Sequence, residues 1–262
     1  MPQRTGYRPG EFCWVDLASH GIDETADFYQ TLFGWSCEKQ DTQGGPPYGI
    51  FCSGGKEVGG LGELNDEMKA QGVPASWNTY VNVESVEDTI AKATASGATI
   101  VVPAMQIMDS GWLAFLQDPT GGVFALWQKN QHFGSAVRDE PVSATWHELA
   151  TRDNDAAKKF YGPLFGWEFG PNPDSPSPYD IISMDGEQRG GFLQMTEEWG
   201  EIPPHWTVYF NVEDVDATAA KAAEIGGRIN CPAFDIPVGR IAMLADCHGA
   251  AFTVIQLNSQ KE

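Results

Sequence analysis

The sequence predicts an α+β fold built from two tandem copies of one domain. Residues 28–35 (FYQTLFGW) return as residues 160–167 (FYGPLFGW), with six of the eight positions identical. Other residues pair in the same order along the chain: Trp14 matches Trp146 at an offset of 132, and the offset shortens slowly to 128 towards the ends of the copies. Within each copy, helical spacing of apolar residues is confined to two short stretches, and strand-like runs separated by turns fill the rest.

The repeated stretch predicts a helix that leads directly into a strand. Phe28 and Leu32 fall at helical spacing and form part of a buried stripe. Gly34 and Gly166 follow at the point where helices commonly end with a left-handed residue, a conformation that glycine adopts at little cost. Trp35 then begins the next strand.

Each copy repeats one order of elements twice, namely one strand, one helix and three strands. In the first copy we expect helices at 23–33 and 86–96, and strands at 12–18, 35–40, 48–53, 57–64, 77–83, 98–106, 112–117 and 122–128. The second copy follows the same plan, with helices near 153–165 and 215–226 and strands from 146–149 to 251–256. The chain therefore predicts four βαβββ units in two domains, residues 1–133 and 144–262, joined by a linker at 134–143.

Side chains alternate across a strand, so one face of each sheet packs under the helices and the other faces a hollow. In the first strand Val15 and Leu17 suit the helix side, which turns Trp14 and Asp16 towards the hollow. The same reasoning gives the expected ligand-facing residues, which are Trp14, Asp16, Asn78, Tyr80, Asn82 and Trp127 in the first copy and Trp146, Glu148, Thr207, Tyr209, Asn211 and Thr253 in the second. Such a set provides aromatic walls and polar tips for a small molecule, although the tryptophans are equally suited to filling the core.

Asp16 and Glu148 are the candidate catalytic residues. A carboxylate beside a tryptophan in a closed hollow has a raised pKa and can act as a general acid or base near neutral pH. The alternative is that each carboxylate accepts hydrogen bonds from Tyr80 or Tyr209, or from the backbone, and only satisfies the interior.

The net charge of −20, from 36 acidic and 16 basic residues, argues against nucleic acid and anionic membranes as partners. No apolar run reaches the roughly 18 residues of a membrane span, and the first residues lack the apolar stretch of a secretion signal. We therefore expect a cytoplasmic protein, a monomer or a homodimer, that binds a small molecule. The five cysteines form no CxxC pair, which favours buried thiols over disulfides or zinc ligands.

The chain resembles the vicinal oxygen chelate superfamily, the group of glyoxalases, bleomycin-resistance proteins and extradiol dioxygenases. The resemblance rests on the βαβββ order and on short motifs: the joints at 28–35 and 160–167, the Gly-Gly strands at 59–61 and 190–192, the DPTGG turn at 118–122, which is similar to the family's DPDGN signature, and its degraded copy at 246–249. It is closest to tandem two-domain members found in actinobacteria and often labelled hydroxylases. The resemblance implies two glyoxalase-like domains, each a curved mixed sheet around a cavity.

The resemblance also implies a divalent metal ion held by His and Glu residues from the first, fifth and last strands of a domain. Here the last-strand position holds Ala125 or Thr253, and the fifth-strand position holds Asn78 or Thr207. These side chains do not supply the imidazole and carboxylate ligands that a catalytic ion requires. We therefore expect no metal ion and no other cofactor at the usual place.

The remaining histidines and two arginines do not complete a site. Four histidines are expected in loops or turns, namely His20, His132, His205 and His248. His147 is on a strand but on the side opposite to the hollow, and Arg189 and Arg240 are expected at the surface.

Three functions remain open from the sequence. The first is a metal-independent lyase, hydroxylase or isomerase that acts on a small aromatic or carbonyl-bearing metabolite, with Asp16 or Glu148 moving a proton. The second is a binding or resistance protein that sequesters such a molecule without turnover. The third is a metal-dependent glyoxalase or dioxygenase with an atypical site.

Overall fold

The computed structural model describes residues 4–175 and 177–258. The first sheet consists of β1 (Phe12–Ser19), β2 (Ser36–Gln40), β3 (Tyr48–Ser53), β4 (Lys56–Glu63), β5 (Ser76–Asn82), β6 (Thr99–Ile107), β7 (Gly111–Gln117) and β8 (Val123–Lys129). The second consists of β9 (Ala144–Thr151), β10 (Glu168–Pro171), β11 (Tyr179–Met184), β12 (Glu187–Gln194), β13 (His205–Asn211), β14 (Arg228–Ile236), β15 (Gly239–Ala245) and β16 (Ala251–Leu257). The helices are α1 (Ile22–Phe33), α2 (Asp66–Ala70), α3 (Val86–Ala95), α4 (Asn154–Phe165) and α5 (Val215–Glu224), with a 3-10 turn at Glu197–Trp199.

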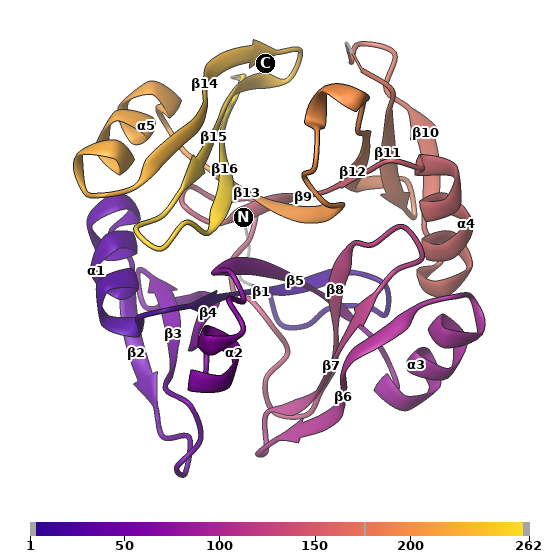
Figure 1. Cartoon of the computed structure of the whole chain (residues 1–262), viewed down its shortest axis with the longest axis horizontal. Coiled ribbons are helices and arrows are strands. Elements are labelled where there is room, and N and C mark those ends of the chain that lie inside the picture. Colours follow the sequence, from indigo (N-terminus) through magenta and orange to yellow (C-terminus); the bar gives the residue numbers. More distant parts are fainter. Residues whose placement is uncertain (1–3, 176, 259–262) are drawn as a thin grey trace.

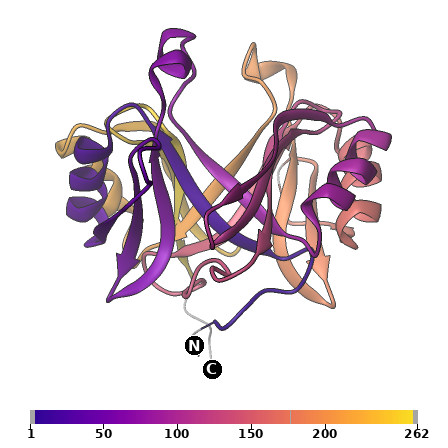
Figure 2. The ribbon, with the colours of Figure 1, turned by 90° about the horizontal axis from the view of Figure 1, so that it is seen from below.

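Both sheets have the same topology, so the predicted α+β fold of four βαβββ units is confirmed. The strand orders are β2-β3-β4-β1-β5-β8-β7-β6 and β10-β11-β12-β9-β13-β16-β15-β14. At the centre of the first sheet β1 pairs parallel with β4 and antiparallel with β5, and β9 does the same with β12 and β13 in the second. The sequence pattern missed α2 and the 3-10 turn, which lie in the loops between the two halves of each sheet and project on the same side of the molecule (Figure 2).

The two helix-to-strand joints have the predicted geometry. Gly34 and Gly166 both adopt φ 72°, in the left-handed region, and their backbone N–H groups donate to the carbonyl oxygens of Gln30 and Gly162. No atom lies within 4 Å of the position that a Cβ would take at either glycine. Glycine is therefore favoured there by backbone conformation alone.

The hydrophobic cores are shared between the two copies. The helices pair across the copies, α1 beside α5 and α3 beside α4, with the first sheet in the lower half of Figure 1 and the second sheet in the upper half. One core joins the first half of the first copy to the second half of the second copy, and includes Trp35, Phe51, Phe210 and Phe252. The other core joins the remaining halves. Each domain therefore needs the other to bury its helix-facing surface.

The two sequence motifs meet at this shared interface. Tyr161, from the repeated joint of the second copy, donates a hydrogen bond of 2.7 Å to Asp118 in the DPTGG turn of the first copy. Tyr29 donates to Asp246 in the reciprocal arrangement, at 3.4 Å. Asp118 also accepts from the backbone N–H groups of Thr120 and Gly122, so each signature turn is tied both to itself and to the other domain.

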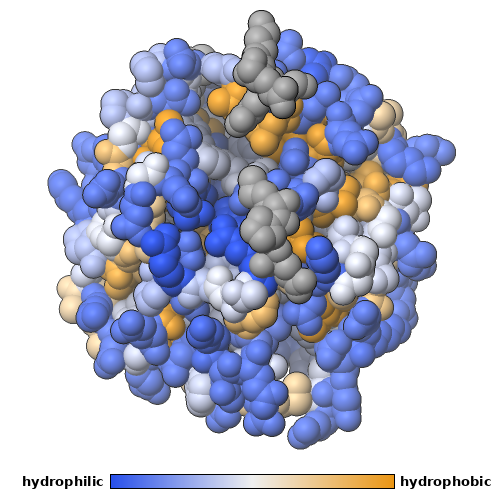
Figure 3. Space-filling model, turned by 180° about the vertical axis from the view of Figure 1, so that it is seen from behind, coloured by the Kyte–Doolittle hydropathy of each residue, from blue (hydrophilic) through white to orange (hydrophobic). Residues whose placement is uncertain are grey.

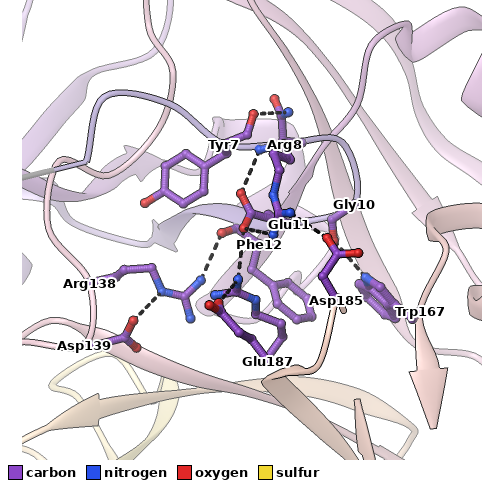
Figure 4. A network of polar contacts seen from close by, with 12 residues as sticks. Tyr7, Arg8, Gly10, Glu11, Phe12, Arg138, Asp139, Trp167, Asp185 and Glu187 are labelled. Atoms are coloured by element: carbon purple, nitrogen blue, oxygen red, sulfur yellow. Dashed lines mark hydrogen bonds and ion pairs between the residues drawn. The ribbon is translucent and has the colours of Figure 1, made fainter. Parts of the chain in front are cut away.

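A buried ion pair connects the segment before β1 to the second domain. Glu11 accepts from Arg189 at 3.1 Å, and Arg8 contacts both Glu11 and Asp185 (Figure 4). The expectation that Arg189 lies at the surface was wrong, because this side chain is only 7% exposed. Glu11 is equally buried, and each of the two charges has a second partner, Arg8 for Glu11 and Glu187 for Arg189.

The surface seen from behind is largely hydrophilic, with hydrophobic residues in separate patches (Figure 3). This agrees with a chain in which 36 residues are acidic and 16 basic. Among the described residues, none of the helices combines the length and the hydropathy needed to cross a membrane. The five cysteines are free thiols.

Candidate functional site

The face of the first sheet opposite to the helices carries a carboxylate with two short hydrogen bonds. Asp16 on β1 lies opposite Asn78 on β5, and its Oδ1 accepts from the Asn78 amide at 2.9 Å. Its Oδ2 accepts from the Tyr80 hydroxyl at 2.8 Å. Burial raises the pKa of Asp16, and these two hydrogen bonds offset part of the effect.

A second tyrosine, which the sequence analysis missed, completes this group. Tyr48 on β3 accepts a hydrogen bond from the indole N–H of Trp14 at 3.4 Å. Its hydroxyl lies against Gly60, where a Cβ would come within 2.0 Å of that oxygen and within 3.0 Å of the Asp16 Cβ. We call Trp14, Asp16, Tyr48, Asn78 and Tyr80 the first site.

The second sheet carries the matching group. Burial raises the pKa of Glu148 on β9, and the nearby hydroxyls of Tyr179 and Tyr209 offset part of this effect. The indole N–H of Trp146 donates to Tyr179 at 2.8 Å, and Thr253 on β16 lies opposite Tyr209 on β13. Thr207 lies opposite Glu148, in the place of Asn78. We call Trp146, Glu148, Tyr179, Thr207, Tyr209 and Thr253 the second site.

The sequence held one signal for the missed tyrosines. Pro47-Tyr48 returns as Pro178-Tyr179 at an offset of 131, which is also the offset between Gly60 and Gly191. A Cβ at Gly191 would lie 2.2 Å from the Tyr179 hydroxyl oxygen. Each Gly-Gly strand therefore leaves room for a tyrosine to lie across it.

The structure places the other expected residues at the edges of the two groups. The Asn82 amide donates to the Tyr7 carbonyl oxygen at 2.9 Å, and the Trp127 indole donates to that of His132 at the same distance. The backbone of Asn211 bonds to the linker at Ser143. These three side chains make no described hydrogen bond to either carboxylate.

A family model described as a glyoxalase-like domain matches residues 14–127 and again residues 146–255. The chain belongs to the glyoxalase-like domain family. It is 35% identical over 259 residues to "Putative glyoxylase CFP32" of Mycobacterium tuberculosis (strain CDC 1551 / Oshkosh), covering 98% of both chains. It is 31% identical over 266 residues to "Anthracycline biosynthesis protein DauV" of Streptomyces sp. (strain C5), covering 97% of this chain and 95% of the relative.

Solved structures support the same fold. The Mn(II)-bound glyoxalase from Novosphingobium aromaticivorans superposes with a TM-score of 0.64 at 16% identity, covering 95% of this chain and 82% of that one. The 2,3-dioxygenase LapB from Pseudomonas sp. KL28 superposes with a TM-score of 0.63 at 14% identity, covering 96% and 93%. At these identities the likeness extends to the fold alone. The match to the glyoxalase-like family model in both copies confirms the resemblance seen in the sequence, and these neighbours share its fold.

The donor groups of this glyoxalase-like protein do not fit a divalent metal ion. Each site presents one carboxylate, accompanied by tyrosine hydroxyls and an amide or a threonine. Across residues 4–175 and 177–258, no three His, Cys, Asp or Glu side chains lie close enough together to hold an ion. A catalytic zinc ion, for comparison, takes three protein ligands. No chemical step is therefore assigned to a metal.

Two histidines lie close to the sites or to the domain interface. His132 lies over Trp14, with the ring centroids 4.6 Å apart and the planes nearly perpendicular, and its Nε2 is 3.2 Å from a carboxylate oxygen of Glu57. His147 faces the other domain, stacked on Phe12 and 3.2 Å from the Thr79 hydroxyl. His132 thus supports the first site, whereas His147 belongs to the domain interface.

A cavity of about 670 Å³ lies outside both sites, between the segment before β1, the turn after β3 and the linker. Its walls include Arg4, Ser53 and Val137. A small void of about 10 Å³ lies behind Trp14, next to His147 at the domain interface.

Proposed function

We propose that this glyoxalase-like protein binds a small, flat aromatic or carbonyl-bearing metabolite and moves a proton on it without a metal ion, with Asp16 or Glu148 as the base. The observation that carries this proposal is the repeated grouping of a carboxylate of raised pKa with a tryptophan and two tyrosines on the open face of each sheet. The name of the relative in anthracycline biosynthesis fits such a ligand, because anthracyclines are fused aromatic ketones.

The chemistry follows from the groups present. The carboxylate removes a proton from a carbon conjugated with a carbonyl group, the C–H electron pair moves towards the carbonyl oxygen, and an enolate forms. A tyrosine hydroxyl donating to that oxygen stabilises the negative charge as it develops. Return of the proton to the oxygen or to another carbon completes a tautomerisation, so no other reactant is consumed.

The second candidate function is binding without turnover. It is favoured by the two short hydrogen bonds to Asp16, at 2.8 and 2.9 Å, which show that the carboxylate is well satisfied by its own neighbours. A carboxylate has about four lone-pair positions, so these bonds leave room for a ligand proton but reduce the basicity of the group.

Hydrogen–deuterium exchange separates the two functions. Anthrone, a flat tricyclic ketone with an acidic CH₂ group, is incubated anaerobically with the protein in D₂O, and exchange is followed by NMR. An enzyme accelerates exchange, and Asp16→Asn together with Glu148→Gln abolishes the acceleration while binding persists. If the protein only binds anthrone, the ligand quenches the tryptophan fluorescence of the protein while the exchange rate stays equal to that in buffer alone. This result would exclude the proton-transfer proposal.

The pH dependence gives an independent check. Burial raises the pKa of both carboxylates, and only the deprotonated form acts as a base. The exchange rate should therefore increase as the pH rises through the raised pKa, at a higher pH than an exposed carboxylate would show. A rate that is already maximal near pH 4, the ordinary range of exposed carboxylates, would rule out Asp16 and Glu148 as the base.

The metal-dependent alternative is tested by elemental analysis of the purified protein. We expect no stoichiometric Fe, Ni, Zn or Mn, and exchange activity that survives dialysis against a chelator. One equivalent of such a metal per domain, with activity lost on its removal, would overturn the proposed mechanism.

A further inference from the structure

The cavity between the segment before β1, the turn after β3 and the linker is large enough to hold a small molecule. Its volume is about 670 Å³, and ligand pockets typically measure about 300–1,000 Å³. Its described wall comes from three parts of the chain that are far apart in sequence, residues 4–6, residues 53, 54 and 56, and residues 136–141. This wall contains none of the side chains of the two carboxylate sites, so the cavity is a separate place on the molecule.

The charges in the cavity wall have the opposite balance to those of the whole chain. The chain has 36 acidic and 16 basic residues. The wall has three basic and two acidic residues, namely Arg4, Lys56, Arg138, Asp139 and Glu140. The Asp139 carboxylate already accepts from the Arg138 Nε at 3.0 Å and from the Thr145 hydroxyl at 3.1 Å. Positive charge thus gathers at this cavity in a strongly acidic protein, and a concave site lined by one sign of charge attracts ligands of the other sign.

Arg138 is the buried cation of this wall. Its side chain is only 7% exposed. Its Nε donates to Asp139, and its Nη1 donates to the Phe12 carbonyl oxygen at 3.4 Å (Figure 4). None of the hydrogen bonds within residues 4–175 and 177–258 uses the Nη2 group. A guanidinium group carries five N–H donors in a fixed fork, so Arg138 keeps donors available for a ligand.

Arg4 and Lys56 add two cations that no described carboxylate pairs with. The backbone N–H of Arg4 donates to the Ala136 carbonyl oxygen at 3.0 Å, which fixes the segment before β1 against the linker. Lys56 begins β4 and lies opposite Ser53 across the turn. Neither side chain forms an ion pair within the described part of the chain. Thr5 and Ser53 bring two hydroxyl groups to the same wall.

We propose that this cavity binds a small organic anion through a phosphate or carboxylate group, with Arg4, Lys56 and Arg138 holding its oxygen atoms. Arginine and lysine form charge-assisted hydrogen bonds with such groups, and these are the stronger kind of hydrogen bond in proteins. Val137 and Pro141 in the wall offer an apolar surface for the organic part of the ligand. The anion contacts the linker and the first domain together, so its binding stabilises the folded chain.

Calorimetric titration of the full chain tests this site. The probes are inorganic phosphate, phenyl phosphate and benzoate, with benzamide as the neutral control, at about 0.15 M ionic strength, where exposed charges more than about 8 Å apart are largely screened. Lys56→Gln and Arg4→Gln each remove one charge from the wall. Lys92→Gln is the matched control, because it removes the same charge from an exposed position on α3, outside the cavity. Arg138 is kept, since it is buried and bonded to Phe12.

We expect one equivalent of anion to bind per chain, and benzamide not to bind. Lys56→Gln and Arg4→Gln should each weaken binding about tenfold, the effect of losing one charge-assisted hydrogen bond, whereas Lys92→Gln should bind as the wild type does. Binding of phenyl phosphate without benzoate would identify a phosphate group as the one recognised, and the reverse result a carboxylate. The melting temperature of the wild type should rise with the concentration of the anion that binds.

Two results would overturn the proposal. One is the absence of saturable binding of all three anions to the wild type. The other is an equal loss of affinity in the variants of Lys56, Arg4 and Lys92, which would show that net charge and not the cavity attracts the anion. Melting temperatures of the free variants confirm that each is folded. Anthrone exchange is measured separately, so failure of this site and failure of the proposed function are distinguishable.

Discussion

At the scale of single residues, burial decides what the titratable groups can do. Asp16 and Glu148 have raised pKa values because the surrounding apolar side chains disfavour their charge, and the tyrosine hydroxyls recover part of that cost. The pKa of His147 is shifted in the opposite direction, because its charged form is the protonated one. Burial at the domain interface and the nearby Arg138 lower this pKa well below the ordinary value. A buried base of lowered pKa stays neutral, and this makes the interface sensitive to acid.

The folded protein should become less stable as the pH is lowered, because His147 is held neutral in the folded state. In the unfolded chain a histidine binds a proton as the pH drops through about 6.5, whereas the buried His147 stays neutral, so the unfolded state gains the proton and stability decreases. We expect the melting temperature of the wild type to drop more between about pH 7 and about pH 5 than that of His147→Gln, which keeps a partner for Thr79. The other titrating groups are common to both proteins, so parallel melting curves across this range would contradict the assignment.

At the scale of elements, glycines act in two different ways. Gly34 ends α1 in a left-handed conformation with open space around it. Gly60, in contrast, lies in the middle of β4, directly opposite Asp16, and gives up its side chain so that Tyr48 can lie across the strand. Gly34 is thus required by its backbone conformation, whereas Gly60 is required by the space that the Tyr48 side chain occupies.

Two alanine substitutions separate these roles. Gly34→Ala should cost about 1 kcal/mol of stability through left-handed strain and leave anthrone exchange unchanged. Gly60→Ala should displace the Tyr48 hydroxyl, because the new Cβ would lie 2.0 Å from it, and so lower the contribution of the first site to anthrone exchange. Urea unfolding and the exchange assay measure both effects, and a fully active Gly60→Ala would show that Tyr48 does not need this position.

At the scale of the whole molecule, the domains are held together by reciprocal contacts between the repeated joint and the signature turn. Tyr161 meets Asp118 and Tyr29 meets Asp246, with Trp206 and Trp77 donating to the two tyrosine hydroxyls. The signature turns therefore act in domain pairing, away from both sites. Because the two cores are shared, unfolding should be cooperative across the chain.

Loss of one tyrosine hydroxyl tests this pairing. Tyr161→Phe removes a buried 2.7 Å hydrogen bond to a carboxylate and should cost about 1.5–3 kcal/mol. Tyr29→Phe is the matched control, since its bond to Asp246 is longer, at 3.4 Å, and its loss should cost less. Urea unfolding followed by tryptophan fluorescence gives both values, and a larger cost for Tyr29→Phe would contradict the ranking.

The sequence by itself determined the order of the strands and helices, the duplication, the left-handed glycines, and the side of each strand on which Asp16 and Glu148 lie. These properties depend on spacing along the chain, with a period of two in strands and 3.6 in helices, so neighbouring residues specify them.

Only the tertiary structure decided that Tyr48 and Tyr179 accept from the indoles of Trp14 and Trp146, that Arg189 is buried against Glu11, and that the two largest cores are shared between the copies. Contacts of this kind depend on the order of strands in the sheet and on the register between strands far apart in sequence. The pairing of β3 with β4, for example, brings the Tyr48 hydroxyl against Gly60, twelve residues further along the chain. Periodicity along the chain carries no information about that distance.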